Sequence, residues 1–294
     1  MFQSMLVPLD GSTLAEEALP LAAALAEQNK ASLSLTVVHP WGAAEDAPPP
    51  ASRADRELRE AEGRYLNHLI QRVASAYRIP VCEAVLDGTP TGETLEEYVR
   101  RRRIDLVVAS THNHGVLGRF LSTGVARFLA HHSRTSVLFT KPQVASMPVN
   151  LAGFQKILVA LDGSPQAEVI LSAAASLVAP ERGTITLLRV VASAGQSPGR
   201  VDNEARSYLE QLAGPLRLRG NTIDAAVVRG ENVAKAILDY AEQQDVDLIA
   251  LTTHQRSWAA RTVFGSVADA LIRSARVPVL VCHNTRPSIS NPGK

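Results

Sequence analysis

Two acidic residues, Asp10 and Asp162, each follow a short apolar run and precede the dipeptide Gly-Ser. A run of this kind reads as a β-strand, and the Gly-Ser pair with the helical pattern behind it reads as a tight turn and a helix start. A carboxylate at the end of a strand can accept hydrogen bonds from a sugar hydroxyl or an adenine amino group. It can equally cap the turn that follows it, through the backbone of that turn. Both interpretations stay open for each acid.

A second pair of polar segments follows the fourth apolar run of each half. The first reads Ser-Thr-His-Asn from Ser110, and the second reads Thr-Thr-His-Gln from Thr252. Each leads to a predicted helix start, at residues 123–125 in the first half and 265–267 in the second. Backbone N–H groups at a helix N-terminus are unpaired and carry a partial positive charge, which suits phosphate. The acids and these helix starts are therefore the candidate ligand contacts.

The elements that position these residues occur as two copies of one pattern. Asp10 and Asp162 lie 152 positions apart (162 − 10), whereas Gly88 and Gly230 lie 142 apart (230 − 88), so a net difference of ten residues falls between. Strand and helix patterns alternate in each copy, and the fourth strands are apolar throughout, as in parallel sheets covered on both faces. In the first copy a helix is predicted over Leu14–Glu27, with Ser12 as its cap.

Five strands per copy, separated by helices, predict two doubly wound α/β domains, each with a five-stranded parallel sheet. The domains are expected at residues 1–142 and 153–285. Residues 143–152 are expected to link them, and residues 286–294 to form a disordered tail.

Composition excludes several classes of function. The chain has 294 residues, 30 basic and 29 acidic side chains, a net charge of +1 and 4% aromatic residues, which argues against nucleic acid as a partner. No apolar run approaches the roughly 20 residues that span a bilayer, and the sequence begins in a strand pattern rather than a signal peptide. Cys82 and Cys282 have no metal-ligand spacing. We therefore expect a cytoplasmic protein with no metal site, no structural disulfide and no membrane partner.

Taken in order, these motifs resemble the universal stress protein family. The resemblance rests on the strand-Asp-Gly-Ser runs, the Thr-His loop after the fourth strand, the Gly-Ser helix start at Gly265 and the last strand at Pro278–Val281. Both copies match over nearly their whole length, so the chain is similar to tandem two-domain members. The resemblance implies Rossmann-like sheets with strand order 3-2-1-4-5. It also implies that Ser136–Phe139 and Pro278–Val281 pair the domains as an intramolecular pseudo-dimer, and that two such chains can form a homodimer.

The resemblance further implies a nucleotide site in each domain. In the nucleotide-binding branch of the family, the phosphate loop reads Gly, two residues, Gly, nine residues, Gly, and then Ser or Thr. The aligned positions are Thr252, Gln255, Gly265 and Ser266 in the second copy, and Ser110, Asn113, Thr123 and, one place late, Gly124 in the first. The other residues carried over as nucleotide contacts are Ala160, Asp162, Val190, Leu251 and Val267 in the second copy, and Pro8, Asp10 and Val38 in the first.

The two copies have kept this loop unequally. Glycine permits a positive φ and a close approach of backbone amides to phosphate, so the missing glycines weaken both sites. The second copy keeps a Gly-Ser helix start and is the stronger candidate, although the first keeps Pro8 where the second has Ala160.

We therefore expect a stress-response protein that binds an adenine nucleotide, ATP with or without Mg²⁺, without catalysis. The alternative is a nucleotide-free interaction or scaffold module with degenerate pockets. An enzyme is not expected, because no general base is paired with a nucleophile.

Overall fold

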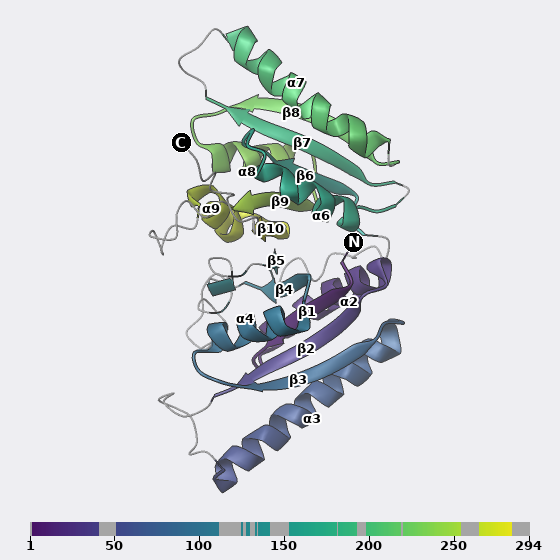
Figure 1. The fold of residues 1–294 in the computed structure, drawn as a ribbon, viewed down its shortest axis with the longest axis vertical. Helices are drawn as coiled ribbons and strands as arrows, with labels where there is room; N and C mark the ends of the chain where they lie inside the picture. The colour runs from purple at the N-terminus through teal and green to yellow at the C-terminus, as the bar shows by residue number, and fades with distance from the viewer. Residues whose placement is uncertain are drawn as a thin grey trace, which may run out of the picture.

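The computed structural model shows an elongated α/β molecule in which two similar halves meet end to end (Figure 1). It describes residues 2–40, 51–111, 125, 128–129, 133, 135–141, 153–180, 182–192, 198–218, 220–253 and 265–283. The predicted linker at 143–152 and the predicted tail at 286–294 lie outside these residues.

Strands and helices alternate along both halves. The first half contains β1 (Ser4–Leu9), α1 (Thr13–Glu16), α2 (Ala18–Asn29), β2 (Ser32–His39), α3 (Arg53–Ala76), β3 (Val81–Asp87), α4 (Thr91–Arg102), β4 (Leu106–Ser110) and β5 (Ser136–Thr140). The second half contains β6 (Lys156–Ala160), the short 3₁₀ helix η2 (Ala167–Val169), α6 (Ile170–Leu177), β7 (Thr184–Val191), α7 (Pro198–Arg217), β8 (Thr222–Arg229), α8 (Val233–Gln243), β9 (Leu248–Thr253), α9 (Ser266–Ser274) and β10 (Val279–His283).

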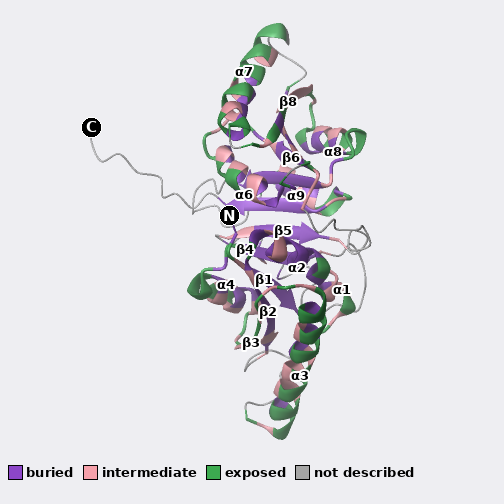
Figure 2. Cartoon of the chain, turned by 90° about the vertical axis from the view of Figure 1, so that its right-hand side faces the viewer, coloured by how far each residue is buried: buried purple, intermediate pink, exposed green. Residues whose placement is uncertain are grey.

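The ten strands of the described residues form one continuous sheet in the order β3-β2-β1-β4-β5-β10-β9-β6-β7-β8. Each half therefore has the expected order 3-2-1-4-5, and its strands pair in parallel. The central strands are buried between layers of helices whose outer sides are exposed (Figure 2), whereas the edge strands β3 and β8 are mostly half-buried or exposed. The predicted fold class is confirmed.

The two half-sheets join through β5 and β10, which pair antiparallel. Val137, Leu138 and Phe139 lie opposite Val281, Leu280 and Val279, respectively. All six side chains are buried, so the junction is a continuation of both cores. The predicted pairing of the last strands is confirmed. We call this junction the seam.

The predicted single helix over Leu14–Glu27 is wrong in one respect, because it is split into α1 and α2 at Glu17. A continuous helix would need a hydrogen bond from residue 20 to the carbonyl of residue 16. Residue 20 is Pro20, which has no N–H to donate. The predicted cap is confirmed, since the side chain of Ser12 accepts a hydrogen bond from the N–H of Ala15.

An ion pair ties the helix after the second strand to the end of the third strand in each half. In the first half Arg59 on α3 pairs with Asp87 on β3, with Nη1 and Oδ1 2.6 Å apart. In the second half Asp202 on α7 pairs with Arg229 on β8, with Oδ1 and Nη2 2.9 Å apart. The helix supplies the cation in one half and the anion in the other, so the two pairs have opposite polarity.

Candidate functional site

The carboxyl ends of the first and fourth strands lie side by side in each half. β1 lies between β2 and β4, and β6 lies between β7 and β9. Strand order reverses at these positions, where doubly wound sheets bind their ligands. Ala160 at the end of β6 is the register partner of Leu251 in β9, which places the Asp162 turn beside the segment that begins at Thr252.

Both acids cap the turns that follow them. Asp10 Oδ1 accepts hydrogen bonds from the N–H (2.9 Å) and the hydroxyl (2.6 Å) of Ser12, and Asp162 Oδ1 accepts one from the N–H of Ser164 (2.9 Å). The glycine between acid and serine has a φ of 79° in the first turn and 87° in the second, a conformation that favours glycine. Asp162 is exposed and Asp10 is half-buried, so the second acid is the more accessible to a ligand.

The hydroxyls at the ends of β4 and β9 differ between the halves. Ser110 is buried, and its Oγ has no hydrogen-bond partner among the described residues. The aligned Thr252 is also buried, but its Oγ1 donates to the carbonyl of Ala167, 3.1 Å away. In the described part of the second half, the buried hydroxyl without a partner at this edge is that of Thr253. Such a hydroxyl costs free energy until it is hydrogen-bonded, so the Thr253 hydroxyl has unused hydrogen-bonding capacity, whereas the Thr252 hydroxyl already donates within the chain.

Helix α9 begins at Ser266 with Gly265 as its N-cap, which confirms the predicted helix start. Both residues are exposed. Gly265 has φ −54° and ψ 129°, which other residues also adopt, and a Cβ placed on it would meet no atom within 4 Å. The first N–H groups of a helix have no intrahelical partner, so this open end of α9 can accept an anion.

The other predicted contacts occupy strand ends or the first turn of α9. Half-buried positions are Ala160, Val190 and Val267 in the second half and Val38 in the first, whereas Pro8 and Leu251 are buried. Leu251 is part of the hydrophobic core. Gln255, Asn113, Thr123 and Gly124 lie outside the described residues.

A tyrosine packs behind the acid turn of the second half, and no pattern in the sequence analysis pointed to it. The Tyr208 hydroxyl donates to Glu168 Oε1 at 3.3 Å, and the Arg189 guanidinium lies 5.5 Å from the centre of the Tyr208 ring. Burial raises the pKa of Tyr208 to about 12, and the carboxylates of Glu168 and Asp162 add to the shift. A Cβ on Gly163 would come within 2.8 Å of the Arg189 guanidinium carbon, so a larger residue would displace this arginine, and the φ of the turn favours glycine in addition.

The first half repeats this arrangement with a different arginine. Burial, followed by the charge of Glu16, raises the pKa of Tyr65. Glu16 pairs with Arg72 on α3, with Oε2 and Nη2 2.9 Å apart. The repeat itself carries the signal that would have found this cluster, because Glu16 and Glu168 are separated by the same 152 positions as the two acids (168 − 16).

A buried charged cluster lies at the end of β2, one residue beyond Val38. His39 is fully buried, with Nε2 3.0 Å from Asp55 Oδ1 and Nδ1 2.8 Å from Glu62 Oε2. Each ring nitrogen thus has a carboxylate oxygen within hydrogen-bond distance. Arg59 extends the cluster, with Nε 3.4 Å from Asp55 Oδ2. The second half has Val191 at the corresponding position.

Asp55 is expected to make the stability of the first half depend on pH. Its hydrogen bond with His39, supported by the Ala51 N–H and by Arg59, lowers the pKa of Asp55 below its ordinary value of 3.8. A lowered pKa means that folding favours the carboxylate, so this contribution is present above the ordinary pKa and is lost as the pH falls through the lowered value. The gap in urea midpoint between the wild type and Asp55→Asn should therefore shrink below about pH 4. A gap that stayed constant from about pH 7 to pH 3 would contradict this.

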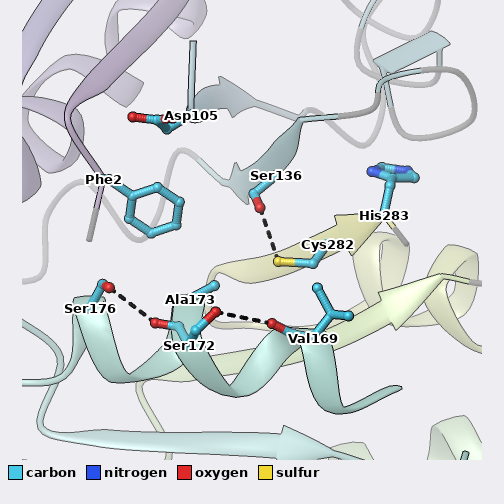
Figure 3. Close-up of a pocket in the computed structure, with 9 residues that line it drawn as sticks. All are labelled: Phe2, Asp105, Ser136, Val169, Ser172, Ala173, Ser176, Cys282 and His283. Carbon is cyan, nitrogen blue, oxygen red and sulfur yellow. Dashed lines mark hydrogen bonds between the residues drawn. The ribbon is translucent and has the colours of Figure 1, made fainter. Parts of the chain in front are cut away.

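A hollow of about 230 Å³ lies at the seam, between α6 and the strands β5 and β10 (Figure 3). The Ser172 and Ser176 hydroxyls donate to carbonyls of their own helical segment, at 3.3 and 3.0 Å. Ser136 Oγ lies 3.0 Å from Cys282 Sγ, and burial raises the pKa of this thiol to about 11. Because these polar groups already have partners within the chain, we assign no ligand to the hollow.

Within the described ranges, no group of three or more His, Cys, Asp and Glu side chains is placed to hold a metal ion. No helix in the described part of the chain is both long and apolar enough to cross a membrane.

Comparison with known proteins identifies the family. The model of the universal stress protein family matches residues 1–141 and again residues 153–283. A universal stress protein of Mycobacterium bovis and one of Mycobacterium tuberculosis are each 26% identical over 270 residues, which cover 86% of this chain and 88% of the relative. The crystal structure of a universal stress protein from Archaeoglobus fulgidus matches with a TM-score of 0.72 at 20% identity, over 96% of each chain. With two such domains over most of its length, this chain belongs to the universal stress protein family as a tandem member.

Proposed function

We propose that this chain binds an adenine nucleotide, ATP with or without Mg²⁺, without catalysing a reaction, and that the second domain is the main site. The observation that carries the proposal is the exposed start of α9 at Gly265 and Ser266, at the same sheet edge as the exposed carboxylate of Asp162. The helix start suits phosphate, and the carboxylate suits a ribose hydroxyl or the adenine amino group. The family supports a stress response as the setting, and we propose the cytoplasm as the location.

One observation favours a second candidate function, a nucleotide-free interaction module. Thr252 donates inward to Ala167, and Asp10 and Asp162 already accept hydrogen bonds within their own turns. Polar groups that have partners in the free protein gain less from a ligand than unpaired ones. The two candidates are separated by whether the protein binds nucleotide at all.

A thermal-shift series with ATP and Mg²⁺ tests the proposal. A ligand at 100 times its Kd adds about 2.7 kcal/mol to the free energy of unfolding, so the wild type should melt at a clearly higher temperature in millimolar ATP. The absence of any shift would refute nucleotide binding and leave the interaction module.

Gly265→Asp is expected to abolish the shift. Aspartate is a favourable N-cap residue and has room at this position, so the variant should fold, while its carboxylate repels phosphate. Gly63→Asp on α3 is the matched control, because a Cβ there also meets no atom within 4 Å and the charge change is the same. If Thr123→Asp removed the shift while Gly265→Asp did not, the main site would be in the first domain.

A further inference from the structure

A lysine of the first domain caps a helix of the second. Lys141 follows β5, and its Nζ donates to the carbonyl oxygens of Arg273 at 2.6 Å and Ala275 at 2.8 Å. These residues form the C-terminal end of α9, which has Ala275 as its C-cap. The last carbonyls of a helix have no intrahelical partner and carry the negative end of its dipole. An ammonium therefore satisfies two carbonyls and the dipole together.

The geometry of the seam accounts for this contact. β5 and β10 are antiparallel, so the carboxyl end of β5 lies beside the amino end of β10, where α9 ends. The other end of the seam has a reciprocal but weaker contact, in which His283 Nδ1 lies 3.3 Å from the carbonyl oxygen of Thr135. Each domain thus extends a side chain from its last strand to the backbone of the other.

Helix α9 joins this contact to the proposed phosphate site. It has nine residues and is therefore about 13 Å long. Its first residue, Ser266, lies at the proposed site, and its last carbonyls lie at Lys141. Lys141 is half-buried, and this burial lowers the pKa of its ammonium.

We propose that Lys141 is a positioning residue for α9, through which nucleotide occupancy of the second domain and the pairing of the two domains stabilise each other. This regulation rests on the proposed function for its ligand. If the contact of Lys141 with the C-terminal end of α9 raises the affinity for nucleotide at the N-terminal end by some factor, nucleotide binding must strengthen the Lys141 contact by the same factor. Domain pairing and ligand affinity then change together.

The test compares Lys141→Met with Lys141→Arg in the full chain. Methionine keeps most of the side-chain length without a charge or donor, and arginine restores both. Without nucleotide, Lys141→Met should accelerate amide hydrogen exchange in α9, and with ATP it should weaken affinity by roughly five-fold, at the lower end of ordinary coupling. Lys141→Arg should restore both values toward those of the wild type.

The matched control is Lys156→Met. Lys156 Nζ donates to the carbonyl of Gln244 at the end of α8, at 2.9 Å, so this variant removes the same kind of cap from a different helix of the second domain. Lys156→Met should leave the rate of amide hydrogen exchange in α9 and the affinity for ATP unchanged.

Two outcomes would overturn the inference. One is an unchanged exchange rate in α9 of Lys141→Met, and the other is faster exchange with wild-type ATP affinity. A wild type that binds no ATP would instead refute the proposed function and with it the coupling, while the exchange rates would still decide whether Lys141 holds α9.

Discussion

Replacing His39 with leucine is expected to lower the free energy of unfolding by about 3 kcal/mol. The imidazole is fully buried and lies between the carboxylates of Asp55 and Glu62. Leucine fills a similar volume but has no N–H, so Asp55 Oδ1 and Glu62 Oε2 would both lose the donor that lies between them. Breaking a buried ion cluster costs this much because the remaining charges stay desolvated. Urea denaturation at neutral pH, followed by Trp41 fluorescence in a Trp258→Phe background, measures the loss.

A triple variant separates charge from packing at this site. His39→Leu combined with Asp55→Asn and Glu62→Gln removes both carboxylates and nearly keeps their shapes. It should recover most of the lost stability, because a buried ion cluster removed as a whole costs far less than one left half-paired. A loss below about 1 kcal/mol in the single variant, or no recovery in the triple, would show that the cluster is not held by charge.

The seam should show a measurable coupling between Leu138 and Leu280. These residues are register partners across β5 and β10, and both side chains have no exposed surface. Each Leu→Ala substitution should lower the free energy of unfolding by about 3 kcal/mol. The double variant should lose about 1 kcal/mol less than the sum, because the second truncation removes a contact that the first has already lost.

The control cycle pairs Leu280 with Leu66 on α3. Leu66 is equally buried but belongs to the first domain, away from the seam. The losses of unfolding free energy in Leu66→Ala and Leu280→Ala should sum to the loss in the double variant within about 0.5 kcal/mol. If the Leu138–Leu280 cycle were additive to the same degree, the seam would not be an energetic continuation of the two cores.

Much of the fold could be predicted from the sequence because it depends on local patterns that occur in both halves of the chain. Apolar runs such as Leu106–Ser110 specify parallel strands, and Ser12 caps its helix as its residue type predicts. The pairing of β5 with β10 came from the family resemblance rather than from periodicity. The break at Glu17 was not predicted, because the apolar pattern runs on through Pro20, whose missing N–H interrupts the helix one turn earlier.

The candidate site was harder to predict, because side-chain direction is set by contacts distant in sequence. Nothing near Thr252 shows that its hydroxyl donates to Ala167, 85 positions away, so its neighbour Thr253 was overlooked. The partners of His39, Asp55 and Glu62, lie on another element, α3. Their position on one face of that helix is the only indication of the cluster in the sequence. The ranking of the two domains rested on glycine spacing and on the Gly265-Ser266 helix start, and it stays a prediction.

The opposite polarity of the two helix-to-strand ion pairs also bears on how a duplicated chain avoids misfolding. Two similar halves on one polypeptide can exchange equivalent parts as they form. If α3 docked on the second half, Arg59 would face Arg229, and if α7 docked on the first, Asp202 would face Asp87. Each crossed arrangement places like charges together, whereas each correct one places opposite charges together. The reversed pairs thus distinguish α3 from α7 and disfavour their exchange, as repulsive contacts do in other discriminating interfaces.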